Sequence, residues 1–292
     1  MIRALHLSLT VGTTAVSTAT IKSFIDLASQ YRFNTIVLFR EMAIRLDSLP
    51  SVYYATGAWT KAEFIDVIAY IKARGMSYVF NIAALTHQNV FFSRGDKRYM
   101  KNSTLEYNPR RPEVQQIMFN VINEIVALSN PMAIHIGHDE VSETDTENLQ
   151  PELYVESVQM LRNHIKSHNI ETWMWGDMLI APSEFPSEST AYCRGDFLNY
   201  YTYRSQIPPD IVICDWHYTY TGAVYDSTVI FRAEGRQVIG ATWDNNVGTK
   251  NFIRYAKSVG IRGMMCTIWA YVLTDIPRAN GIIRSFDGAF IT

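Results

Sequence analysis

The chain has 292 residues, of which 48% are hydrophobic and 18% charged, a composition typical of a folded globular protein and unlike that of a disordered one. Lysine and arginine together number 26, and aspartate and glutamate 28, so the formal net charge at pH 7 is −2. This near balance argues against a nucleic-acid binder and a polybasic membrane binder, because both require a cationic surface.

The cysteines and the N-terminus indicate the cellular compartment. Cys193, Cys214 and Cys266 lie far apart and form no CxxC pattern. Cys214 and Cys266 fall inside apolar runs, which predicts buried thiols in a reducing environment. No apolar run is long enough to span a membrane, and the first residues lack the features of a signal peptide. We therefore expect a cytoplasmic protein; the alternative is that an export signal precedes the sequence given.

Short apolar runs alternate with longer amphipathic segments along the whole chain. The short runs contain β-branched and aromatic residues and are bounded by Gly, Asn, Asp or Pro, as strands are. The predicted strands are 2–9, 34–39, 77–82, 132–136, 171–175, 211–215, 237–242 and 263–268.

The longer segments have the apolar stripe of amphipathic helices. Thr60 and Glu63 have the spacing of a capping box, and Pro112 suits the first turn of a helix. The predicted helices are 18–31, 60–73, 112–128, 151–168, 222–234, 248–259 and 277–286, whereas 181–208, rich in Pro, Ser and Tyr, gives no clear element.

Eight βα units without a linker or a break in composition predict an α/β fold, a single (β/α)8 TIM barrel that forms one domain over residues 1–292. The competing fold is a doubly wound open sheet. That fold usually has a glycine-rich phosphate turn after an early strand, and residues 10–14 (TVGTT) lack one. Since barrels carry their chemistry at the C-terminal ends of the strands, site residues are expected there.

The fourth predicted strand is followed by two adjacent acids, Asp139 and Glu140. Further side chains of interest stand at or beside the ends of later strands: Trp173, Trp175, Trp216, Trp243, Trp269, Asp177, Asp215 and Asp244. Indole faces pack against sugar rings, and an acid beside a second acid and an indole has the raised pKa of a general acid. These residue types predict glycoside hydrolysis. The alternative is that Asp139 caps a turn and Glu140 meets solvent.

A metal site is the hypothesis of another class, with His135, His138 and Asp139 as ligands. Neighbouring strand residues alternate between faces, so the two histidines need not converge, and their spacing matches no zinc signature. We predict no metal and no cofactor. His87 is a lone loop histidine, which more often lies at the surface or forms a hydrogen bond than takes part in catalysis.

The stretch 107–141, from Tyr-Asn-Pro-Arg-Arg-Pro-Glu-Val to Ile-His-Ile-Gly-His-Asp-Glu-Val, resembles the catalytic domain of glycoside hydrolase family 20, the β-N-acetylhexosaminidases. That family has a similar Asn-Pro-led helix and then a strand ending His-x-Gly-Gly-Asp-Glu-Val. In this chain His138 stands where the family usually has the second Gly. Segments 3–7 (RALHL), 20–26 and 33–36 (FNTI) are also similar, and weaker similarity covers the rest of the chain.

The resemblance implies a barrel in which the 2-acetamido group of the sugar attacks its own anomeric carbon. It implies that Glu140 is the general acid/base and that Asp139 orients the acetamido nitrogen. The predicted substrate-binding residues are His87, Trp175, Trp216, Tyr218, Trp243, Asp244, Trp269 and Tyr271.

The chain departs from the family pattern in residues that hold the outer hydroxyls of the sugar. An Asp and an Arg usually end strand one, where Ser8 and then residues 10–13 stand, and a Glu usually follows strand eight, where Tyr271 stands. In the family, strand seven usually ends with a Tyr that hydrogen-bonds the acetamide oxygen. This chain lacks that Tyr, and Trp243 or Tyr218 is the candidate to replace it. We therefore expect weak activity on simple aryl N-acetylglucosaminides. Either the substrate is a larger or modified sugar that is held by other groups, such as Arg40, Glu41 or Asp244, or catalysis has decayed.

The predicted function is therefore removal of a terminal β-linked N-acetylhexosamine from a carbohydrate partner, without nucleic acid or membrane; the sequence leaves the oligomeric state open. One alternative is a retaining glycosidase with two carboxylates, in which Asp177, Asp215 or Asp244 is the nucleophile. The other is a sugar-binding protein on a barrel that has lost catalysis.

Overall fold

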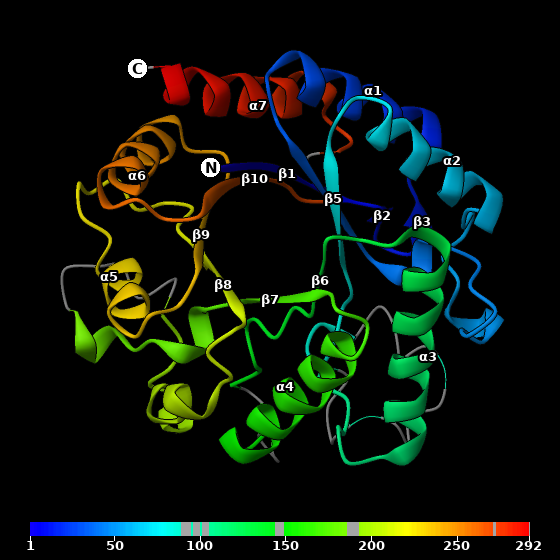
Figure 1. Cartoon of the computed structure of the whole chain (residues 1–292), viewed down its shortest axis with the longest axis horizontal. Helices are drawn as coiled ribbons and strands as arrows, with labels where there is room; N and C mark the ends of the chain where they lie inside the picture. The colour runs from blue at the N-terminus through cyan, green and yellow to red at the C-terminus, as the bar shows by residue number, and fades with distance from the viewer. Residues whose placement is uncertain are drawn as a thin grey trace.

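The computed structural model describes residues 1–88, 95, 100, 105–143, 149–185, 193–270 and 273–291. Eight parallel strands close into a barrel in which neighbours follow chain order and β1 pairs with both β4 and β10 (Figure 1). The barrel strands are β1 (Ile2–Ser8), β4 (Thr35–Phe39), β5 (Ser77–Asn81), β6 (Ala133–His135), β7 (Glu171–Trp175), β8 (Val212–Trp216), β9 (Val238–Thr242) and β10 (Gly263–Ile268). The predicted (β/α)8 fold is confirmed, and each predicted strand agrees with the observed one to within one residue at either end.

The helices surround the strands (Figure 1). In the described part of the chain they are α1 (Thr18–Gln30), α2 (Lys61–Lys72), α3 (Pro112–Ser129), α4 (Pro151–Lys166), α5 (Asp226–Ala233), α6 (Asn246–Val259) and α7 (Ile276–Ile291). The predicted capping box of α2 is present, with Thr60 and Glu63 exchanging hydrogen bonds. None of these helices is both long and apolar enough to cross a bilayer.

Two predicted helix boundaries were wrong. Helix α5 begins at Asp226 rather than at residue 222, because the buried ring of Tyr225 stacks on Phe252 with centroids 4.0 Å apart and holds the preceding chain extended. Helix α7 continues to Ile291 rather than ending at residue 286, since Phe286 and Ala289 extend its buried face.

The connection between β7 and β8 forms short 3-10 turns where the other connections form α-helices. In the described residues these turns are Asp177–Leu179, Pro182–Glu184 and Phe197–Gln206. The last is interrupted at Leu198 and Asn199, whose φ angles of 46° and 59° are left-handed and cannot continue a helix.

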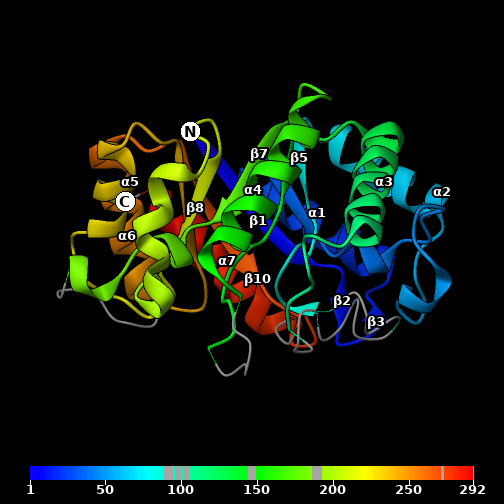
Figure 2. The ribbon, with the colours of Figure 1, turned by 90° about the horizontal axis from the view of Figure 1, so that it is seen from below.

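Each barrel strand is buried on both faces. In β4, Ile36 and Leu38 pack toward the helices, whereas Val37 belongs to a second apolar cluster inside the barrel. The same alternation points Ala4 of β1 inward and Leu5 and Leu7 outward. The hairpin of β2 (Thr10–Val11) and β3 (Thr14–Ala15), which follows the C-terminal end of β1, lies at the lower rim in Figure 2.

Gly176 sits where the end of β7 packs against β8 and α5. A Cβ atom there would lie 2.7 Å from a methyl carbon of Ile213 and 3.0 Å from the Phe231 ring. We expect Gly176→Ala to lower the free energy of unfolding by about 1–3 kcal/mol through overpacking, measured by urea denaturation.

Gly281→Ala is the matched control, because Gly281 lies within α7 and a Cβ atom there meets nothing within 4 Å. This change should raise the free energy of unfolding by about 1 kcal/mol through helix propensity. Equal effects of the two substitutions would contradict the packing described here.

Candidate active site

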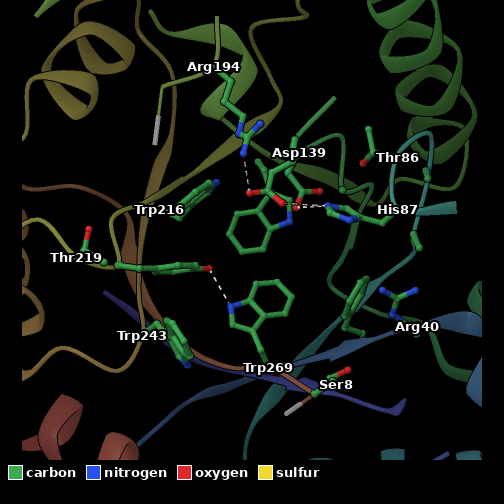
Figure 3. Close-up of a pocket in the computed structure, with 18 residues that line it drawn as sticks. Ser8, Arg40, Thr86, His87, Asp139, Arg194, Trp216, Thr219, Trp243 and Trp269 are labelled. Atoms are coloured by element: carbon green, nitrogen blue, oxygen red, sulfur yellow. Dashed lines mark hydrogen bonds and ion pairs between the residues drawn. The ribbon is translucent and has the colours of Figure 1, made fainter. Parts of the chain in front are cut away.

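A cavity of about 580 Å³ opens at the C-terminal ends of the barrel strands. Most of the residues singled out from the sequence line it (Figure 3): His87, Asp139, Glu140, Trp175, Trp216, Tyr218, Trp243 and Trp269. Ser8 and Arg40 line it too, whereas Arg194 and Thr219 were not foreseen. The closed barrel therefore brings residues from most of the chain into one pocket.

One predicted binding residue in the described part of the chain, Asp244, does not join this group. The Asp244 carboxylate does not line the cavity and is held by Arg278, whose Nε donates to it at 2.6 Å. The Asp244 side chain thus turns toward α7, and its role in substrate binding stays a prediction. Tyr271 lies outside the described residues.

The acids are presented by a left-handed turn after β6. Gly137, His138 and Glu140 have φ angles of 71°, 67° and 50°, a region that non-glycine residues seldom occupy. Helix α4 supports this turn from outside, since the Tyr154 hydroxyl donates to the His138 carbonyl at 3.0 Å. The segment therefore reverses sharply and directs Asp139 and Glu140 into the cavity.

His138 is buried and neutral within this turn. Its Nδ1–H donates to the Ile136 carbonyl at 2.9 Å, so Nε2 is left to accept from the Ser157 hydroxyl at 3.0 Å. Burial lowers its pKa to about 4, in agreement with this neutral tautomer. His138 thus acts as a structural support at a position that needs a positive φ.

His135 and His138 point to different sides of the chain. His135 lies against Trp175 in the barrel interior, with ring centroids 4.6 Å apart, and its Nδ1 accepts the Gly137 N–H at 3.0 Å. The two rings consequently do not form the ligand set, completed by Asp139, that the sequence left open.

His87 and Asp139 form an ion pair at the mouth of the turn. His87 Nε2 is 3.2 Å from Asp139 Oδ2 and 3.7 Å from Glu140 Oε2. The charge of Asp139 is the main cause that raises the pKa of His87 to about 9, so the imidazole is protonated at neutral pH. Burial by itself would raise the pKa of Asp139, but the charge and hydrogen bond of His87 outweigh it and lower that pKa.

Among the described residues, the side chains that could surround a cation are these same three. Ligand atoms of His87, Asp139 and Glu140 lie within 4.8 Å of one another. The same atoms form the His87–Asp139 ion pair, so a cation bound there would have to replace the imidazole proton.

The aromatic residues form a wall facing the acids. The Trp175 and Trp269 centroids are 6.1 Å apart, and those of Trp216 and Tyr218 are 4.8 Å apart. The Trp269 indole N–H donates to the Tyr218 hydroxyl at 3.2 Å, while Trp243 meets Tyr218 edge-on. Figure 3 shows Trp216, Trp243 and Thr219 on one side of the pocket and His87 and Arg40 on the other.

Two cationic side chains line the cavity besides His87. Arg194 Nη2 lies 3.5 Å from Glu140 Oε1, and Nη1 lies 3.5 Å from Glu143 Oε1. Arg40 stacks over the Phe39 ring at 4.7 Å, and its buried Nη1 has no hydrogen-bond partner among the described residues. Arg40 follows a strand end, which signals a site position, whereas Arg194 lies in the segment that gave no sequence pattern.

The three acids considered as nucleophiles each accept hydrogen bonds from other groups of the protein. Asp215 accepts hydrogen bonds from Ser227 and Thr228 at 2.9 and 2.6 Å, on the α5 side of β8. Asp244 pairs with Arg278, and Asp177 accepts the backbone N–H of Glu140 at 2.9 Å. None of the three lines the cavity.

Comparison with solved structures yields enzymes of related architecture. Flavobacterium johnsoniae chitobiase has a TM-score of 0.71 at 14% identity, covering 98% of this chain and 48% of that one. The family 20 exo-β-N-acetylglucosaminidase of Vibrio harveyi, in complex with N-acetylglucosamine, has a TM-score of 0.69 at 16% identity, covering 97% and 54%. Dispersin B has a TM-score of 0.67 at 16% identity, covering 99% and 98%.

At these identities the likeness establishes a shared fold. This chain spans about half the length of the first two proteins and nearly all of Dispersin B. Neither models of protein families nor curated proteins match the sequence.

The His87–Asp139 pair can be tested without a substrate. In the wild type the His87 imidazole should titrate near pH 9, as measured by nitrogen-detected NMR. In Asp139→Asn its pKa should fall below that of the wild type, because the charge that favours the protonated ring is removed. An unchanged pKa would contradict the ion pair.

Proposed function

We propose that this chain is a glycoside hydrolase that releases a terminal β-linked N-acetylhexosamine with retention of configuration. The observation that carries the proposal is the Asp139–Glu140 turn, which places two acids in a cavity walled by indoles with Asp139 held ionised by His87. The enzymes that share the fold support the choice, and the Vibrio harveyi structure contains N-acetylglucosamine. The partner is accordingly a carbohydrate.

In the proposed first step Glu140 donates its proton to the glycosidic oxygen as the bond to the anomeric carbon breaks. The carbonyl oxygen of the 2-acetamido group forms a bond to the same carbon and gives an oxazolinium ion. The ionised Asp139 accepts the acetamido N–H and opposes the positive charge that develops there.

In the second step the Glu140 carboxylate accepts a proton from water as the water oxygen attacks the anomeric carbon. The oxazolinium ring opens, restores the acetamide and leaves the sugar with its original configuration. His87 stays hydrogen-bonded to Asp139 and keeps that carboxylate aimed at the acetamido nitrogen. Trp175, Trp216 and Trp269 surround the acetyl group, with the Tyr218 hydroxyl beside them.

The two-carboxylate alternative lacks a nucleophile in the described part of the pocket. Retaining enzymes of that kind place their carboxyl groups about 5–5.5 Å apart across the sugar. Asp177, Asp215 and Asp244 lie outside the lining, and the two acids that do line it are sequence neighbours. The geometry therefore favours assistance by the substrate.

Arg40 is the best candidate to replace the missing grip on the outer oxygens of the sugar. Glu41, also considered from the sequence, is buried and accepts the Ala83 N–H at 3.0 Å without lining the cavity. Asp244 is occupied by Arg278. Of these three, Arg40 alone lines the pocket, and its buried Nη1 has no hydrogen-bond partner in the described part of the chain.

The function is tested with chromogenic glycosides that carry or lack a 2-acetamido group. Only the acetamido sugars should be cleaved, because the nucleophile belongs to that group. Glu140→Gln should lower kcat by roughly 10²–10⁴-fold on a substrate with a poor leaving group, and by less on one that needs no proton. Cleavage of a plain glucoside at a comparable rate would instead support an enzyme nucleophile, and binding without turnover a sugar-binding protein.

The role of Arg40 is tested by Arg40→Gln. Loss of charge-assisted hydrogen bonds worth roughly 1.5–3 kcal/mol should lower kcat/KM by about tenfold to a hundredfold. Arg45→Gln is a suitable control, because Arg45 does not line the cavity. Steady-state kinetics that are the same for wild type and Arg40→Gln would remove Arg40 from substrate binding.

A further inference from the structure

Asp177 lies directly behind the acids of the pocket and is not used in the mechanism above. It follows β7, begins the 3-10 turn Asp177–Leu179, is 2% exposed and does not line the cavity. Its Oδ2 accepts the Glu140 N–H at 2.9 Å, and its backbone carbonyl accepts the Arg194 N–H at 2.9 Å. One residue thus holds the backbone of both members of the Glu140–Arg194 ion pair.

Glu140 depends on such an anchor. Its φ of 50° is left-handed, and its side chain is 36% exposed at the cavity. The side chain contacts His87 and Arg194 at 3.7 and 3.5 Å, distances too long to fix a carboxyl group firmly. The hydrogen bond from its N–H to the buried Asp177 carboxyl group is shorter, at 2.9 Å, so it helps to determine where the Glu140 side chain leaves the backbone.

We propose that Asp177 is a positioning residue whose carboxyl group accepts the Glu140 N–H and aims the Glu140 carboxyl at the leaving-group oxygen. This inference rests on the proposed function. It adds Asp177, a residue behind the pocket that acts on the reaction through Glu140.

The surroundings of Asp177 favour its uncharged form. Burial and then the charge of Asp139 raise the pKa of Asp177 to about 8, and they outweigh the hydrogen bonds from the Glu140 N–H and Trp216, which lower it. A neutral carboxyl group keeps one carbonyl oxygen that can accept the Glu140 N–H. It also avoids a third negative charge beside Asp139 and Glu140.

Asparagine tests this assignment, since its amide has the shape of a neutral acid and keeps a carbonyl acceptor. Asp177→Asn should retain kcat within about threefold of the wild type. Asp177→Ala removes the acceptor, and should lower kcat by about 10²-fold on an alkyl N-acetylglucosaminide but by less than threefold on a dinitrophenyl one. The difference arises because only the alkyl leaving group needs a proton from Glu140.

Two outcomes would overturn the inference. If Asp177→Asn loses as much activity as Asp177→Ala, a charged carboxylate is required. If Asp177→Ala loses activity equally on both leaving groups, the residue supports the fold and does not aim the acid. Thermal unfolding of each variant identifies a misfolded protein, and Asp177→Ser replaces the alanine variant in that case, because its hydroxyl is one atom shorter than a carboxyl group.

Asp215→Asn is the matched control. Asp215 is equally buried at 2% exposure, but its carboxylate binds Ser227 and Thr228 outside the pocket. Asp215→Asn should change kcat on the alkyl and the dinitrophenyl substrates to the same extent. If the wild type cleaves no acetamido glycoside, the proposed function itself fails, whereas the results above on an active wild type bear on Asp177 alone.

Discussion

The left-handed turn from Gly137 to Glu140 is the constraint on which the rest of the site depends. Three of its four residues have a positive φ, a conformation that costs energy in residues other than glycine and persists only where the surroundings hold it. Tyr154 of α4 donates to the turn, and Asp177 accepts from it. The barrel and α4 are thus assembled around a segment that has little stability of its own.

The same turn separates the ionisation of neighbouring acids. Asp139 faces the protonated His87, which lowers its pKa, whereas burial and the charge of Asp139 raise the pKa of Asp177. Such a division lets one acid stay negative against a developing cation while another remains neutral. The arrangement suits a reaction in which positive charge forms on the substrate rather than on the protein.

The barrel interior below the cavity explains why the aromatic wall can be rigid. His6 and His135 are buried and uncharged, since burial lowers the pKa of each to about 3. Their rings contact the indoles above, His6 with Trp269 and His135 with Trp175, both at 4.6 Å between centroids. A packed layer of neutral rings supports the indoles without placing a charge under the cavity.

The sequence by itself determined the eight strands, because hydrophobic alternation is local and a closed barrel buries both faces of every strand. It also placed Asp139, Glu140 and the indoles in one pocket, since parallel strands end on one side. Only the tertiary structure decided which acids face that pocket. Asp244 turns to Arg278, 34 residues away in sequence, and Asp177 turns to Glu140, 37 residues away. The direction of a side chain after a strand depends on such distant partners, which no local pattern contains.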